Sequence, residues 1–186
     1  MISLKTFQKK YTHHINKGLS FYKISNWPEY YNIDFDVFLP SKGLNLQRGY
    51  VWTIEQKTAF ILSVLKDQNV NSIVVIQQDL TPRAEKRGEQ QWQIIDGKQR
   101  LSTILDYINN KFPITIKEGI FFFKDLPSDC QIQIEFFNLT VDVHYSYFEK
   151  PISDDVKIDL FEDCNWLGTS QDIEHFNKIK NGHKCV

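Results

Sequence analysis

Apolar residues alternate with polar ones in some segments of the chain and recur at helical spacing in others, which predicts a mixture of strands and helices. Residues 35–40 alternate like a short strand, and residues 73–76 form an apolar run that we expect to pair with residues 91–95. The polar stretch 77–91 between them is typical of a hairpin loop. Thr53, with Gln56 three positions later, predicts the start of a helix that includes residues 59–65.

The second half of the chain continues this succession of elements. Apolar residues at helical spacing predict a helix over residues 101–108. Residues 114–116 and 120–123 are expected strands joined by a turn at 118–119, and residues 132–147 are expected to supply another long strand. Residues 154–163 are expected to be helical, with a last helix from about residue 171. The sequence therefore predicts a mixed α+β domain.

The segment 92–105 carries the strongest indication of chemistry. An apolar strand runs into Asp96-Gly97 and then directly into a helix that starts with Lys98, Gln99 and Arg100. Glycine permits a sharp turn, and the unpaired N–H groups of a helix's first turn favour an anion such as phosphate. The segment does not match the Walker A pattern, so it predicts a different phosphate cradle. The alternative is an ordinary strand–turn–helix with Lys98 and Arg100 at the surface.

Composition limits the functions that the chain can have. With 186 residues, of which 41% are hydrophobic, it can form one sizeable core. A net charge of −1 does not favour a protein that coats nucleic acid through bulk electrostatics. Three cysteines without a CxxC pair indicate neither a disulfide framework nor a cysteine-based zinc site. No bilayer-length apolar segment and no signal-peptide core are found, so we expect a soluble, cytoplasmic protein without a membrane partner.

Several motifs occur together in the order typical of a known family. They are Leu46-Gln-Arg-Gly-Tyr-Val-Trp52, Leu62-Ser-Val-Leu65, Ile95-Asp-Gly-Lys-Gln-Arg100 and Phe161-Glu-Asp-Cys-Asn165 with Gly168-Thr169. The chain thereby resembles the amino-terminal domain of GmrSD-type modification-dependent restriction proteins. The resemblance implies a ParB/sulfiredoxin-like single domain, with a small mixed sheet flanked by helices, over residues 35–186. Residues 1–34 would then form an amino-terminal arm.

The resemblance also implies functions for individual residues. It implies a nucleotide-binding domain, expected to be a Mg²⁺-dependent nucleoside triphosphate hydrolase that acts in DNA restriction and phage defence. Asp96, Gln99 and Arg100 would be catalytic: Asp96 would position water or a magnesium-bound phosphate, and Gln99 would orient the attacking water. Nucleotide would be bound by residues on three segments of the chain, namely Gln47, Arg48, Gly97, Lys98, Ser102 and Asn165. No metal-ligand cluster is predicted. The family commonly has glutamine where this chain has Lys98, which leaves the hydrolytic group open.

Some interpretations stay open on the sequence alone. Tyr50 and Trp52 would either stack on a base or line the core. Arg48 is either a pocket residue or a structural arginine, and Asn165 either completes the site or ends a helix. No HNH-like nuclease block is found, so we expect a standalone domain, a subunit that recruits a nuclease in trans, or a fragment. The alternative function is a noncatalytic DNA-binding or protein-interaction module, and direct DNA nicking is the third hypothesis.

Overall fold

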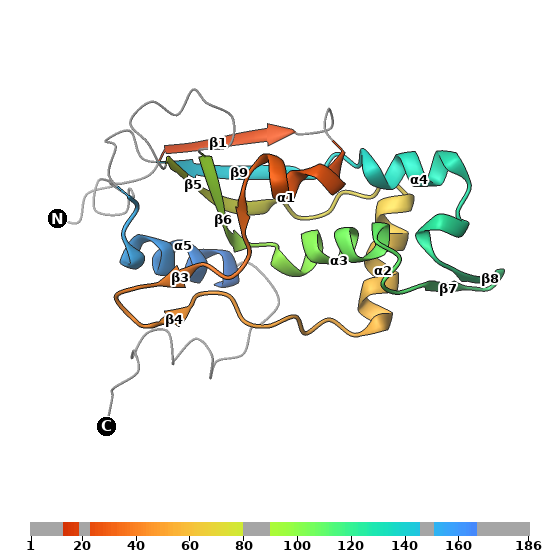
Figure 1. Cartoon of the computed structure of the whole chain (residues 1–186), viewed down its shortest axis with the longest axis horizontal. Coiled ribbons are helices and arrows are strands. Elements are labelled where there is room, and N and C mark those ends of the chain that lie inside the picture. Colours follow the sequence, from red (N-terminus) through yellow and green to blue (C-terminus); the bar gives the residue numbers. More distant parts are fainter. Residues whose placement is uncertain (1–12, 19–22, 80–89, 146–150, 167–186) are drawn as a thin grey trace.

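A five-stranded mixed sheet organises the molecule (Figure 1). The structure is a computed structural model that describes residues 13–18, 23–79, 90–145 and 151–166. The strands are ordered β1-β9-β5-β6-β2, and their bounds are β1 His13–Gly18, β9 Thr140–Tyr145, β5 Ile73–Asp79, β6 Gln90–Asp96 and β2 Ile33–Asp34. The β5–β9 and β2–β6 pairs are parallel, whereas β1–β9 and β5–β6 are antiparallel. The predicted pairing of residues 73–76 with 91–95 is confirmed.

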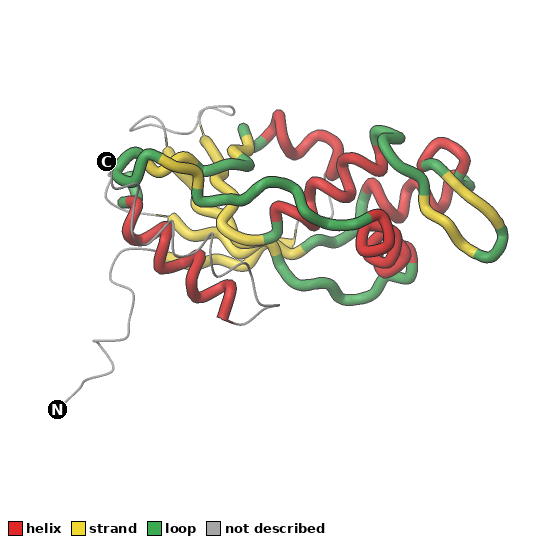
Figure 2. Tube along the Cα trace, turned by 90° about the horizontal axis from the view of Figure 1, so that it is seen from below, coloured by secondary structure: helices red, strands yellow, loops and turns green. Residues whose placement is uncertain are grey.

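Helices and two small hairpins surround this sheet. The helical segments are η2 Ile24–Asn26, α1 Trp27–Tyr30, α2 Ile54–Leu65, α3 Lys98–Ile108, η3 Phe123–Asp125, α4 Ser128–Glu135 and α5 Asp154–Trp166. The hairpins pair β3 Phe38–Leu39 with β4 Leu44–Asn45, and β7 Ile114–Ile116 with β8 Gly119–Phe121. Figure 2 shows the strands of the large sheet in one half of the molecule and several helices beside them, with the β7–β8 hairpin at the far end. The predicted α+β class with a small mixed sheet is confirmed, and the ParB/sulfiredoxin-like assignment stays a prediction.

Side chains on alternate positions of the strands fill two hydrophobic clusters. Val75 and Ile94 belong to the larger cluster, which also contains buried residues of α2 and α3. Ile76 and Ile95, one position further along each strand, belong to a second cluster with β3, β4 and α5. Because neighbouring side chains of a strand point to opposite faces, the sheet separates the two clusters. The fold therefore covers both faces of the central strands β5 and β6.

The start of α2 follows the sequence prediction. The Thr53 hydroxyl accepts a hydrogen bond from the Gln56 N–H at 3.4 Å, and the Gln56 side chain accepts one from the Thr53 N–H at 2.9 Å. This reciprocal capping box satisfies two N–H groups that the helix itself leaves without acceptors. It fixes where the preceding loop, residues 46–53, enters the helix.

The prediction of one long strand over residues 132–147 is wrong at its amino-terminal end. Residues 128–135 form the helix α4, and β9 begins only at Thr140. Ile132 and Ile134 look like alternating strand positions, but in the helix Ile134 is buried while Ile132 is 57% exposed. The predicted strand 35–40 is also shorter than expected, because a turn over residues 34–37 separates β2 from β3. The helix predicted from residue 171 lies outside the described residues.

The segment expected to be an arm contributes to the core of the fold. Ile24 and Trp27 are fully buried in the larger cluster, and Tyr31 stacks on Trp92 of β6 with ring centroids 3.8 Å apart. Two strands of the sheet, β1 and β2, also come from residues 1–34. The boundary between arm and domain stays a prediction, but residues 24–34 pack as part of the domain.

Candidate functional site

The corner between β6 and α3 depends on a glycine. Gly97 has φ +92° and precedes Lys98, the first residue of α3. A Cβ atom at this position would lie 2.0 Å from Cγ2 of Ile73, at the start of β5. The corner therefore requires glycine both for its backbone conformation and for the close approach to β5. In the described part of the chain no side chain caps the amino terminus of α3, so the N–H groups of its first turn are open there.

Arg100 holds this corner against the start of β5. Its Nη2 donates hydrogen bonds to Oδ2 of Asp96 at 2.7 Å and to the Ser72 carbonyl at 2.9 Å. The Arg100 side chain is 16% exposed and that of Asp96 is 28% exposed. Nε of Arg100 is buried and has no hydrogen-bond partner. In this arrangement the guanidinium binds protein atoms, so a bidentate grip on phosphate would require it to leave Asp96 or Ser72.

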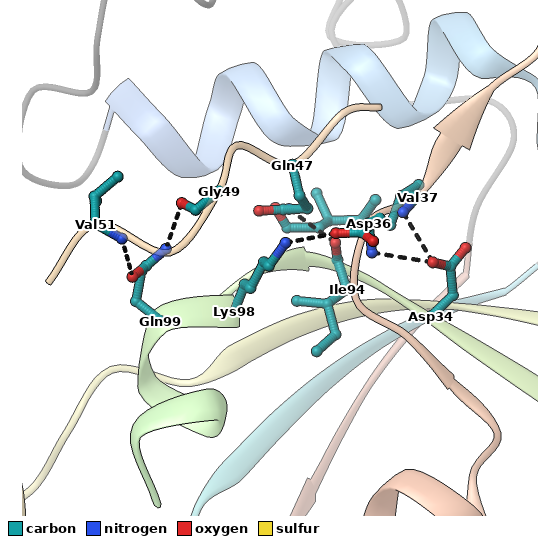
Figure 3. Close-up of polar contacts among 10 residues, drawn as sticks. Asp34, Asp36, Val37, Gln47, Gly49, Val51, Ile94, Lys98 and Gln99 are labelled. Carbon is teal, nitrogen blue, oxygen red and sulfur yellow. Dashed lines mark hydrogen bonds and ion pairs between the residues drawn. The ribbon is translucent and has the colours of Figure 1, made fainter. Parts of the chain in front are cut away.

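Gln99 binds the backbone of the loop that precedes α2 (Figure 3). Its Oε1 accepts a hydrogen bond from the Val51 N–H at 3.1 Å, and its Nε2 donates one to the Gly49 carbonyl at 3.2 Å. Both ends of the amide are therefore used in holding the loop. Each end of the amide keeps a second hydrogen-bonding position, so orienting a water molecule, the role implied by the family resemblance, would use a position that the loop does not occupy.

Gln47 attaches the same loop to the sheet. Its Nε2 donates hydrogen bonds to the carbonyls of Ile94, at 2.8 Å, and Ile95, at 2.6 Å (Figure 3). Arg48 thus lies between two anchored points, one at Gln47 and one at the residues that Gln99 binds. Arg48 is half-buried and forms no hydrogen bond or ion pair with any residue that the structure describes. Within the described residues its donors have no partner, and its predicted place in the pocket stays a prediction.

Lys98 has a partner that the sequence did not indicate. Its Nζ lies 2.7 Å from Oδ1 of Asp36, a residue 62 positions earlier (Figure 3). Ser102 lies one helical turn after Lys98 on α3 and is half-buried. Its hydroxyl makes no hydrogen bond within the described part of the chain. The corner therefore brings together most of the predicted site residues, together with Asp36 and Ser72, which lie in segments without any local motif.

The two aromatic residues of the loop pack against the helices. The Tyr50 hydroxyl shares a hydrogen bond with the Thr103 hydroxyl at 2.5 Å, and Nζ of Lys57 lies 4.2 Å from the Tyr50 ring centroid. Burial raises the pKa of the Tyr50 hydroxyl. Trp52 meets Phe60 edge to face at 5.3 Å. Of the two interpretations, these contacts support packing.

The carboxy-terminal part of the predicted site is described only in its backbone. Asn165 belongs to α5, which continues to Trp166, so Asn165 does not end the helix within the described residues. The Asn165 side chain, Gly168 and Thr169 lie outside the described residues. No group of three or more histidine, cysteine, aspartate or glutamate residues in the described ranges is arranged to hold a metal ion.

No helix among the described residues has both the length and the apolar character needed to cross a bilayer.

Comparison with known proteins identifies the family. No curated protein and no solved structure matches the chain. The model of one protein family, described as the N-terminal domain of the GmrSD restriction endonuclease, matches residues 32–184. This match covers most of the chain and includes the corner at Gly97, the loop at Arg48 and the whole of α5. The protein therefore belongs to the family of GmrSD restriction endonuclease N-terminal domains.

Proposed function

We propose that this domain binds a nucleoside triphosphate together with Mg²⁺ and hydrolyses it as a step of DNA restriction. Membership of the GmrSD family supplies the general role in restriction or defence. The finer elements of the proposal are the nucleotide, its hydrolysis, contact with DNA and a nuclease subunit that acts in trans.

The observation that carries the proposal is the open amino terminus of α3. Its first-turn N–H groups have no side-chain cap, and the helix dipole places positive charge there. Lys98 stands at the first position of the helix, and the loop beside it holds Arg48, which has no partner in the described chain. Two cations next to uncapped N–H groups form a favourable environment for a polyphosphate.

Asp96 is the residue of this chain that suits the magnesium ion. Proteins usually hold Mg²⁺ through one or two carboxylates and the oxygens of the substrate phosphates, so a cluster of three protein ligands is not required. Asp96 is partly exposed, and its Oδ2 bonds Arg100, which leaves the second carboxylate oxygen for the ion or for a water molecule. When bound, the ion would neutralise charge on the phosphate oxygens.

A second function is favoured by a different observation. Three of the predicted site residues act as structural links. Gln47 and Gln99 bind backbone atoms of their own chain, and Arg100 binds Asp96 and the Ser72 carbonyl. A domain with this arrangement would bind a nucleotide, DNA or a partner protein without turnover. This is the noncatalytic binding module, and it differs from the first proposal in releasing no phosphate.

The test combines binding with turnover on the intact chain. Isothermal titration calorimetry with ATP, GTP, CTP and UTP in the presence of Mg²⁺ measures binding, and a phosphate-release assay measures hydrolysis. We expect Asp96→Asn to retain nucleotide binding and lose phosphate release, and Arg48→Gln to lose affinity. Asp106→Asn, on the same helix but paired with Lys111, is the matched control and should behave like the wild type. Binding without phosphate release would support the noncatalytic module, and no binding of any nucleotide would refute the first proposal and leave only a module that binds DNA or a partner protein.

A further inference from the structure

The lysine at the start of α3 already forms an ion pair with a carboxylate of its own chain. Nζ of Lys98 lies 2.7 Å from Oδ1 of Asp36, within the distance of a charge-assisted hydrogen bond. The Lys98 side chain is only 12% exposed, whereas that of Asp36 is 64% exposed. The ammonium group is therefore directed at a carboxylate that is more exposed to solvent than the lysine itself (Figure 3).

A strained turn holds Asp36 in this place. Oδ1 of Asp34 accepts hydrogen bonds from the N–H groups of Asp36, at 3.0 Å, and Val37, at 2.9 Å. Val37 has φ +53° and is fully buried. A β-branched residue rarely adopts this conformation, and it persists only where the surrounding contacts impose it. The fold therefore fixes the backbone at Asp36, and the ion pair with Lys98 places its carboxylate.

The same turn is paired with the segment that carries Arg48. The Leu46 N–H donates to the Val37 carbonyl at 2.9 Å, and the Gln47 N–H donates to the Asp36 carbonyl at 3.2 Å. Asp36 and Arg48 thus belong to two hydrogen-bonded segments on the same side of the corner. An anion that binds the ammonium group of Lys98 must therefore compete with the carboxylate of Asp36.

We propose that Asp36 is a specificity-determining residue of this site, because its carboxylate occupies the phosphate position on Lys98 and an incoming anion must displace it. The inference rests on the proposed function, since it concerns the same nucleotide site. An anion with one charge would replace one ion pair with another of the same kind and leave Asp36 unpaired. A polyphosphate also reaches the first-turn N–H groups and Arg48, so it gains contacts that Asp36 does not make. Every anion that binds Lys98 loses the same ion pair, so the pair sets a threshold that di- and triphosphates pass because their additional contacts offset this loss.

The size of the effect follows from the exposure of the pair. Exposed ion pairs contribute little net stability, so a polyphosphate can displace this one. Removing the competing carboxylate should lower the Kd of a bound polyphosphate by roughly twofold to fivefold. The gain should depend on Lys98, because the competition takes place at its ammonium group.

The experiment is a double-mutant cycle that measures binding of ATP with Mg²⁺, and separately of inorganic tripolyphosphate, by titration calorimetry. The variants of the full chain are Asp36→Asn, Lys98→Gln and the combination, and Asp36→Ser replaces Asp36→Asn if the latter does not unfold cooperatively. We expect Asp36→Asn to tighten both ligands about twofold to fivefold in the wild-type background and to change Kd less than about twofold in the Lys98→Gln background. The same gain with tripolyphosphate, which lacks base and sugar, locates the competition at the phosphates.

Two results would overturn the inference while leaving the proposed function intact. Equal tightening in both backgrounds would mean that Asp36 acts only through general negative charge, and weaker binding of Asp36→Asn would mean that Asp36 supports the ligand. If Lys98→Gln binds the ligand too weakly to measure, the comparison is made with Asp106→Asn, which removes a paired carboxylate from the far end of α3. A gain for Asp106→Asn equal to that of Asp36→Asn overturns the inference, and a gain confined to Asp36→Asn supports it. Absence of binding by the wild type refutes the proposed function itself.

Discussion

Replacing Gly97 with alanine would place a methyl group where the structure has no room for one. The new Cβ would lie 2.0 Å from Cγ2 of Ile73 and 3.1 Å from its Cα, and the residue would keep a φ of +92°. The positive φ costs a residue with a side chain about 1–2 kcal/mol. Forcing an extra methyl into a packed contact adds about 1–3 kcal/mol. We therefore expect Gly97→Ala to lower the free energy of unfolding by about 2–5 kcal/mol.

The matched control is Gly43→Ala in the β3–β4 hairpin. Gly43 also has a positive φ, +67°, but a Cβ there would meet no atom within 4 Å. Both substitutions lose the conformational freedom of glycine in the unfolded chain, so that contribution cancels between them. Urea unfolding followed by circular dichroism should show Gly97→Ala to be less stable than Gly43→Ala by about 1–3 kcal/mol.

The double variant with Ile73→Ala tests whether the overlap with Ile73 is the cause. Ile73→Ala removes Cγ2, so in that background the effect of Gly97→Ala should fall toward that of Gly43→Ala. If Gly97→Ala and Gly43→Ala were equally stable, the corner would not depend on close contact between α3 and β5, and our account of its geometry would be wrong.

Three further predictions test other parts of the structure. Burial raises the pKa of the Tyr107 hydroxyl to about 12. The stability that the neutral hydroxyl contributes is therefore complete below pH 10 and is lost as pH rises toward 12. In urea titrations, Tyr107→Phe should lose less stability than the wild type between these two pH values. Trp27→Ala, at a fully buried position in residues 1–34, should destabilise the fold by about 3–5 kcal/mol, whereas Tyr30→Ala, at a 36% exposed position, should have a much smaller effect on the urea midpoint. Gln99→Ala should speed hydrogen exchange of the Val51 amide by roughly twofold to tenfold, and Gln99→Glu, which keeps the acceptor, should not.

Local patterns in the sequence were sufficient for the elements that organise the corner. The strand before Asp96, the helix after Gly97 and the capping box at Thr53 all depend on residues within a few positions of one another, and all are confirmed. The helix α4 was missed because Ile132 and Ile134 alternate like strand residues although only Ile134 is buried. Pro127, immediately before the first residue of α4, was the available indication of a helix start.

The contacts of the site residues depend on the tertiary fold and could not be predicted. Gln99 was expected to orient water, yet it binds the backbone of a loop about fifty positions earlier in the chain. Lys98 was expected to be available for phosphate, yet it pairs with Asp36, which lies in a segment that the sequence marked only as a strand. Glutamine and lysine have long side chains with many donors, so their partners are decided by whichever backbone or carboxylate the fold brings near. The residue types indicated a polar site at the corner, and the roles expected of Gln99 and Lys98 stay predictions.

The position of β9 in the sheet has a consequence for how the chain acquires its structure. β9 lies between β1 and β5, so β1 is joined to the other described strands through a segment that is made more than a hundred residues later. Its paired residues are 122 positions apart at Gly18 with Thr140 and 132 positions apart at His13 with Tyr145. Such distant pairing slows folding, because a long stretch of chain must be ordered before the contact forms. On the ribosome, β5 and β6 can form their hairpin early, whereas β1 must wait, without its partner in the sheet, until residues 140–145 have emerged.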